Sequence, residues 1–194
     1  MADENKDRQD YIIAHDRLVK LDDLYALFQP GQKVLILGCA QGYWRLYAAE
    51  EIHEDGLVIG VDNDLSDLEP PASNVQLVKA DILSKKKATT LKRLMKTLGP
   101  GANAVLSELF PQLTGDRQVD QAQSLELVKA AWSWAKELLI EGGFFLFKLL
   151  HSQVAEEFLE SLRPCFERST RLKTEPNEFG QEIYVLFRGF KKKP

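Results

Sequence analysis

Short apolar runs of strand length alternate along this chain with longer amphipathic stretches, and this alternation most narrows the folds open to it. The apolar runs at residues 33–37 and 57–61, for example, flank an amphipathic stretch at residues 44–52. A buried strand, a helix and a second buried strand in this order are typical of a βαβ unit with parallel strands. We therefore predict an α/β chain built on a mostly parallel sheet.

The same pattern continues to the end of the chain. The predicted strands are residues 33–37, 57–61, 75–78, 104–107, 144–149, 167–172 and 182–188. The predicted helices are residues 9–28, 44–52, 88–98, 118–139 and 153–164. No repeat or linker divides this series, and 194 residues fit one domain. We expect a single domain over 1–194, with residues 1–10 flexible and 191–194 a basic tail.

Composition narrows the class of protein further. Hydrophobic residues make up 44% and charged residues 28% of the chain, which argues against disorder and collagen-like repeats. The apolar runs are far shorter than the ~20 residues that span a membrane. Residues 1–10 are polar and have no apolar core, so we expect no secretory signal. These features predict a cytoplasmic protein without a membrane partner.

Metal-ligating residues are few and scattered. Cys39 and Cys165 form no CxxC spacing, and the histidines (His15, His53, His151) do not cluster, so we expect no metal. The formal net charge of −4 argues against nucleic-acid binding through bulk positive charge, although it leaves local basic patches open.

The residues that follow the strands are the candidates for a binding site, because ligands of open α/β sheets bind at the carboxyl ends of the strands. A glycine turn from Gly38 to Gly42 follows the first strand and leads into a helix. Asp62 ends the second strand and Asp81 follows the third. A glycine turn followed about 20 residues later by an acid is the layout of a site for an adenosine-containing cofactor.

The spacing of the glycines favours one cofactor over another. A dinucleotide fingerprint reads G-x-G-x-x-G, whereas here Ala40 takes the place of the second glycine and Tyr43 or Trp44 lies beyond Gly42. S-adenosylmethionine is therefore a better fit than a dinucleotide, and an NAD-dependent oxidoreductase is a weak third interpretation of the chain. A plain strand–turn–helix without a ligand is the other alternative.

Further polar residues lie near the ends of the later elements. Glu108 follows the fourth strand, Lys148 stands in the apolar fifth strand, Glu182 opens the last strand and Lys20 lies on the first helix. A lysine among such apolar residues is costly unless it emerges at a strand end beside carboxylates. Each residue alone is typical of a surface ion pair, and their joint pattern is more informative.

This pattern resembles the FtsJ/RrmJ (RlmE-like) family of RNA ribose 2′-O-methyltransferases, from about Asp16 to Lys191. The family's D-L-G-A-A-P-G-G-W matches Ile36 to Trp44, and its S-D-x-A-P-N matches Ser107 to Gln112. The Gly-Gly strand that ends in lysine matches Gly142 to Lys148, and the closing S-x-E-x-Y matches Gly180 to Tyr184.

The resemblance implies a Rossmann-like methyltransferase fold. Its sheet would have seven mostly parallel strands, an antiparallel last strand and helices on both faces. The family's catalytic tetrad would correspond to Lys20, Glu108, Lys148 and Glu182, with Lys148 as the base or orienting group for the hydroxyl. The cofactor would be S-adenosyl-L-methionine, placed by Gly38, Ala40, Gly42 and Trp44, with Asp62 at its ribose and Asp81 at its adenine.

The implied function is S-adenosylmethionine-dependent methylation of a ribose 2′-hydroxyl of RNA, in ribosomal RNA or a ribosomal particle, by a monomer. The alternative is a catalytically degenerate methyltransferase fold that acts as an interaction module. Ile36 replaces an aspartate of the family motif, Gln41 a proline and Tyr43 a glycine. Glu108 is one methylene longer than the family's aspartate.

Overall fold

A computed structural model describes residues 16–41, 43–66, 68, 72–84, 87–173 and 182–192. The predicted flexible residues 1–10, the start of the first predicted helix and residues 193–194 of the tail lie outside this range. The strands are β1 (Lys33–Leu37), β2 (Leu57–Asp62), β3 (Val75–Lys79), β4 (Ala102–Ser107), β5 (Leu139–Leu150), β6 (Arg168–Lys173) and β7 (Glu182–Arg188). The labelled helices are α2 (Tyr43–Glu51), α3 (Lys87–Leu98), α4 (Arg117–Leu138) and α5 (Gln153–Leu162), and residues 16–25 are also helical.

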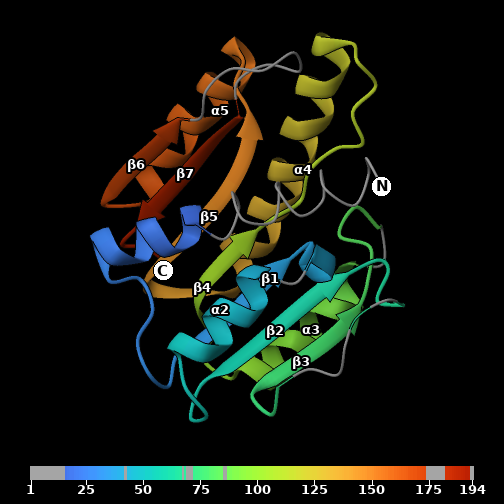
Figure 1. Ribbon diagram of the computed structural model, residues 1–194. Helices are drawn as coiled ribbons and strands as arrows, with labels where there is room; N and C mark the ends of the chain where they lie inside the picture. Colours follow the sequence, from blue (N-terminus) through green and yellow to red (C-terminus); the bar gives the residue numbers. More distant parts are fainter. Residues whose placement is uncertain are drawn as a thin grey trace.

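The strands form one seven-stranded sheet in the order β3-β2-β1-β4-β5-β7-β6 (Figure 1). Strands β1 to β5 pair in parallel, and β7 is antiparallel to both β5 and β6. This confirms the predicted sheet. The strand order reverses between β1 and β4, and such a switch point is where open α/β sheets bind ligands.

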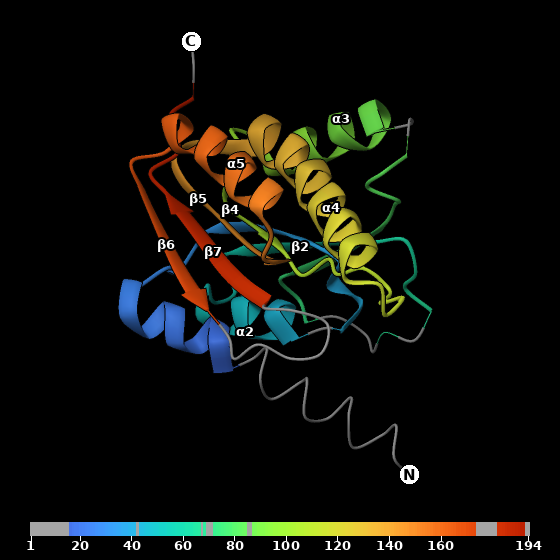
Figure 2. The same cartoon turned by 90° about the horizontal axis from the view of Figure 1, so that it is seen from above.

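Helices cover both faces of the sheet (Figure 2). On one face lie α3, α4 and α5, with Trp134 fully buried in the core cluster beneath them. On the other face lie α2 and the helical residues 16–25, which pack around the fully buried Trp44. The central strands are apolar along their length because both of their faces are covered.

Within the described residues, two boundaries differ from the prediction by three residues or more. Strand β5 begins at Leu139, five residues before the predicted start, because the Gly142–Gly143 segment forms an irregularity within the strand: Ala102 pairs with Leu139, but Ala104 pairs with Phe144. Gly142 and Gly143 are therefore part of the sheet.

The first helix ends at residue 25, three residues earlier than predicted. Oδ1 of Asp22 accepts hydrogen bonds from the backbone N–H groups of Leu27, at 2.6 Å, and Phe28, at 3.0 Å. A side-chain acceptor of this kind competes with the helical hydrogen bonds. Ala26 adopts a left-handed conformation with φ of 47°, and the chain turns toward β1.

Candidate active site

The turn after β1 is packed tightly between the ends of two other strands. Gly38 has a φ of +80°, and its N–H donates to the carbonyl of Val61 at 2.8 Å. A Cβ atom at Gly38 would lie 2.9 Å from Cδ2 of Leu109, in the loop after β4. The position therefore requires glycine for both its backbone angle and its contact. A single 3₁₀ turn (Cys39–Gln41) follows, and Gly42 lies outside the described residues.

Asp62 lies beside this turn. Its Oδ2 atom accepts the N–H of Ala40 at 2.9 Å, and its Oδ1 atom accepts the N–H of Asp64 at 3.2 Å. Asp81 is exposed and comes two residues after Lys79, which pairs with Asp62 across β3 and β2. The two predicted adenosine-binding acids thus follow adjacent strands at the same edge of the sheet.

Glu108 lies on the other side of the switch point. Its backbone N–H donates to the carbonyl of Leu37 at 3.0 Å, so the residue is fixed beside the end of β1. The side chain is only 5% exposed, and its buried Oε1 atom has no hydrogen-bond partner among the described residues. Burial, together with the charge of Asp62, raises the pKa of Glu108 to about 8, against the opposing charges of Lys148 and Arg45.

Lys148 follows Phe147 on β5, and Phe147 pairs with Ser107, the residue before Glu108. The sheet register therefore places Lys148 and Glu108 at neighbouring positions. The Nζ atom of Lys148 lies 4.9 Å from the ring centroid of Phe110, in a cation–π contact that holds the ammonium near the strand end.

Glu182 opens β7 and pairs with Leu150 at the end of β5. Its carboxylate is hydrogen-bonded to the hydroxyl of the buried Tyr184, and burial together with this carboxylate raises the pKa of Tyr184 well above its usual range. Tyr184 in turn pairs with Lys148 across the sheet. The guanidinium of Arg17 lies 5.2 Å from the centroid of the Tyr184 ring.

Lys20 is the outlying member of the predicted tetrad. It is exposed on the helical residues 16–25, and no ion pair within the described part of the chain joins it to Glu108 or Glu182. Arg17, three residues earlier, is the basic residue of this helix that contacts the patch around Tyr184. The structure thus brings Glu108, Lys148 and Glu182 to the ends of neighbouring strands and leaves Lys20 on the covering helix.

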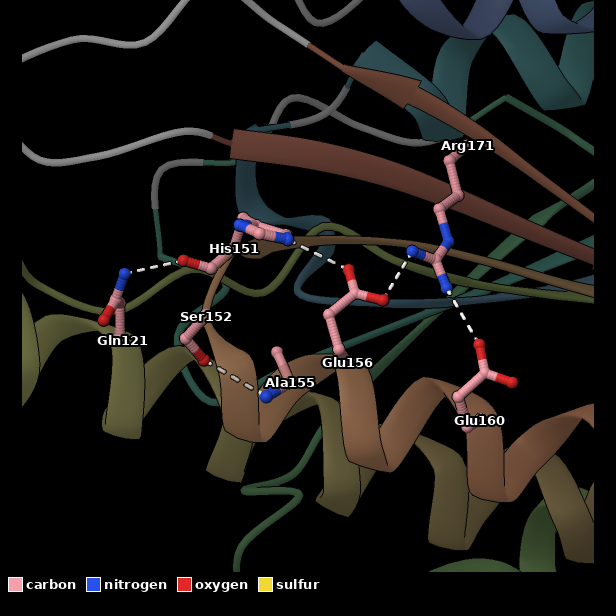
Figure 3. A network of polar contacts seen from close by, with 7 residues as sticks. All are labelled: Gln121, His151, Ser152, Ala155, Glu156, Glu160 and Arg171. Atoms are coloured by element: carbon pink, nitrogen blue, oxygen red, sulfur yellow. Dashed lines mark hydrogen bonds and ion pairs between the residues drawn. The ribbon is translucent and has the colours of Figure 1, made fainter.

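The end of β5, just after Lys148, is held by a polar network (Figure 3). Nε2 of Gln121 donates to the carbonyl of His151 at 2.6 Å, and the His151 ring contacts Glu156 at 3.0 Å. Glu156 accepts from Arg171 of β6 at 2.6 Å. The network joins α4, α5 and β6 around the strand that carries Lys148. Sequence analysis missed it, because the contacts that join its elements link residues 30 positions apart (Gln121 and His151) and 15 positions apart (Glu156 and Arg171), which form no local pattern.

Arg45 is a second residue that sequence analysis missed. It lies in the first turn of α2, is only 4% exposed, and its Nε and Nη1 atoms have no hydrogen-bond partner among the described residues. The buried Oγ atom of Ser107 also has none. Together with Oε1 of Glu108, these atoms are orphaned polar groups near the switch point, where a polar cofactor would satisfy them. The sequence carries no local signal for this burial, because an arginine in the first turn of a helix is usually exposed.

Two of the departures from the family motif, Ile36 and Tyr43, lie in or next to the core. Ile36 is fully buried in β1 and packs in the cluster around Trp44. Tyr43 is partly buried against the same cluster. Trp44 is itself fully buried, with its ring centroid 6.2 Å from that of Tyr184.

Comparison with known proteins identifies the family. The sequence profile described as FtsJ-like methyltransferase matches residues 15–190. The chain belongs to the FtsJ-like methyltransferase family. Membership confirms the predicted resemblance, the predicted enzyme class and S-adenosylmethionine as the cofactor.

Curated relatives carry the name ribosomal RNA large subunit methyltransferase E. The protein of Coxiella burnetii (strain RSA 493) is 33% identical over 178 residues, which are 88% of this chain and 80% of that protein. The Nitratidesulfovibrio vulgaris protein is 34% identical over 171 residues, 87% of this chain and 83% of that protein. The Halorubrum lacusprofundi protein is 32% identical over 184 residues, and this FtsJ-like chain spans 65% of its length.

Solved structures with lower sequence identity show the same fold. A protein described as a ribosomal RNA methyltransferase from Plasmodium falciparum superposes with a TM-score of 0.79 at 21% identity, over 91% of this chain and 96% of that chain. Fibrillarin of Aeropyrum pernix, solved with S-adenosylmethionine, superposes with a TM-score of 0.54 at 16% identity, over 81% and 67%. Within the described residues, no helix is long and apolar enough to cross a membrane.

Proposed function

We propose that this FtsJ-like methyltransferase transfers the methyl group of S-adenosylmethionine to a ribose 2′-hydroxyl of ribosomal RNA. The observation that carries the proposal is the neighbouring placement of Lys148 and Glu108 at the carboxyl edge of the sheet, beside the Gly38 turn. The relatives named ribosomal RNA large subunit methyltransferase E supply the RNA class.

The residues around the switch point suit the cofactor. At this edge Gly38 permits the left-handed turn, with Leu109 packed where a Cβ atom would lie, and Oδ2 of Asp62 lies 2.9 Å from the backbone nitrogen of Ala40, within the turn itself. Asp62 and Asp81 would bind the ribose and the adenine, and the N-terminus of α2 presents N–H groups to the same edge. When bound, S-adenosylmethionine supplies an electrophilic methyl group on a positively charged sulfur.

The ribose 2′-hydroxyl is a weak nucleophile, and the protein must activate it. Lys148, held near the strand end by Phe110, would orient the ribose hydroxyl, and as a neutral amine it would take up the hydroxyl proton and become the ammonium as the oxygen attacks. Glu108 and Glu182 flank Lys148 on the neighbouring strands and would set its position. Lys20 would complete the site from the helix that covers this face.

Methyl transfer to unmodified large-subunit ribosomal RNA, transcribed in vitro, tests the proposal. The RNA is incubated with the full chain and methyl-tritiated cofactor and is then hydrolysed in alkali, which leaves 2′-O-methylated sites as intact dinucleotides. Label in dinucleotides is the expected result, and label in mononucleotides would assign a base methyltransferase instead. Lys148→Ala should abolish the label, whereas Lys136→Ala, on the exposed side of α4, should not change it.

The same assay separates the enzyme from the alternative of an interaction module. RNA or particle binding without any label, in the wild-type protein, would favour the interaction module.

We further propose that the chain works as a single-domain monomer in the cytoplasm. Light scattering of the purified protein checks its mass.

A further inference from the structure

Arg45 presents an unusual electrostatic arrangement. Its side chain is almost fully buried, yet Nε and Nη1 have no hydrogen-bond partner among the described residues. A buried guanidinium with unsatisfied N–H groups destabilises the fold, and for this reason buried charges in proteins are normally paired. The arrangement points to a partner that is not part of the described chain.

Neighbouring acids do not supply that partner. Within the described residues no ion pair joins Arg45 to a carboxylate. Glu108 is close enough for the Arg45 charge to lower its pKa, but burial outweighs this effect and keeps the pKa near 8, so its carboxyl is mostly protonated at neutral pH. The buried Oε1 atom of Glu108 is also without a partner among these residues.

The position of Arg45 indicates which part of a ligand it meets. Its charge acts on Cys39, directly after β1, and on Glu108, directly after β4, so it lies at the switch point. Asp62 and Asp81, on the β2 and β3 side, are the candidate adenosine contacts. A ligand whose nucleoside lay there would have its other end toward β1 and Arg45.

We propose that Arg45 binds the α-carboxylate of the amino-acid end of S-adenosylmethionine. This carboxylate is the one anionic group of the cofactor, and a guanidinium binds a carboxylate through two parallel hydrogen bonds. The assignment rests on the family's cofactor and is independent of the RNA substrate. It makes Arg45 a cofactor-binding residue that distinguishes adenosyl amino acids from plain nucleosides.

Calorimetric titration of the full chain with two ligands tests this assignment. S-Adenosylhomocysteine carries the amino-acid end, and 5′-methylthioadenosine lacks it but keeps the adenosine and the sulfur. Arg45→Met should weaken binding of S-adenosylhomocysteine by about 30-fold and leave 5′-methylthioadenosine within about twofold. Arg45→Lys keeps the charge without the planar fork and should lose about fivefold for the first ligand only.

Thermal unfolding without ligand gives a second readout. If Arg45 is kept for the cofactor, Arg45→Met should unfold at the same or a higher temperature, because it removes an uncompensated buried charge. The proposal would be overturned if Arg45→Met weakened the binding of both ligands equally, with or without a lower unfolding temperature. It would also be overturned if the binding of S-adenosylhomocysteine were unchanged. Wild-type protein that binds neither ligand would overturn it along with the cofactor site, whatever the outcome of the RNA assay.

Discussion

The absence of a side chain at Gly38 lets Leu109 lie against the turn after β1. A Cβ atom there would lie 2.9 Å from Cδ2 of Leu109 and 3.0 Å from its backbone nitrogen. The glycine thus joins the two loops that flank the switch point, the loop after β1 and the loop after β4.

Gly38→Ala should therefore destabilise both the fold and the cofactor site. We expect the free energy of unfolding to fall by about 3 kcal/mol, from left-handed strain and overpacking together, with loss of S-adenosylhomocysteine binding. Denaturant unfolding and calorimetry measure the two effects. Gly31→Ala is the matched control, because Gly31 has a φ of +81° but a Cβ atom at that position would meet nothing within 4 Å. An equal loss of unfolding free energy in both variants would contradict the contribution of the Leu109 contact.

Glu108 should make stability depend on pH. Its folded pKa of about 8 lies above the unfolded value of 4.5, so the folded state holds a proton that the unfolded state releases between these values. Stability should therefore decrease as pH rises from about 4.5 to about 8. Glu108→Gln removes this titration, so the variant's unfolding free energy should fall less over the same interval. Parallel pH profiles for the two proteins would show that Glu108 is ionised in the fold.

Asp22 should be a structural acid at the end of the first helix. Its Oδ1 atom accepts from the N–H groups of Leu27 and Phe28, and its Oδ2 atom accepts from the Tyr47 hydroxyl at 2.8 Å. Asp22→Ala leaves buried donors unpaired and should cost about 3 kcal/mol in chemical denaturation. Asp22→Asn keeps an acceptor oxygen and should cost only about 1 kcal/mol. A similar loss of unfolding free energy in both variants would mean that the charge of Asp22, rather than its hydrogen bonds, accounts for its contribution to stability.

The network at the end of β5 should depend on one of its two glutamates. Glu156 contacts both His151 and Arg171, whereas Glu160 lies 3.6 Å from Arg171 and is more exposed. Glu156→Gln should lower the unfolding free energy by about 1 kcal/mol, and Glu160→Gln by less than about 0.5 kcal/mol. Equal effects measured by thermal unfolding would argue against this ranking.

Asp62 should be required for cofactor binding. Asp62→Ala removes the proposed acceptor for the ribose hydroxyls, as well as the contact with the N–H of Ala40, and should weaken S-adenosylhomocysteine binding at least about tenfold in calorimetry. Asp64→Ala is the control, because Asp64 is exposed and lies outside the turn. Unchanged affinity in Asp62→Ala would place the ribose elsewhere.

The sequence alone determined the strand and helix series, because each buried strand and amphipathic helix carries its own local periodicity. It also indicated Gly38, Asp62, Glu108 and Lys148, because a ligand site at the carboxyl edge requires particular residue types directly after particular strands. Only the tertiary structure showed that Lys148 and Glu108 are neighbours, since they lie on different strands and meet through the register of β4 and β5.

The burial of Arg45, the raised pKa of Glu108 and the early start of β5 were likewise decided only in three dimensions. Burial and charge at one residue depend on what the distant strands and the opposite helix layer place around it. Local sequence carries no record of those neighbours, and so an arginine beside Trp44 resembles an ordinary helix residue until the fold encloses it.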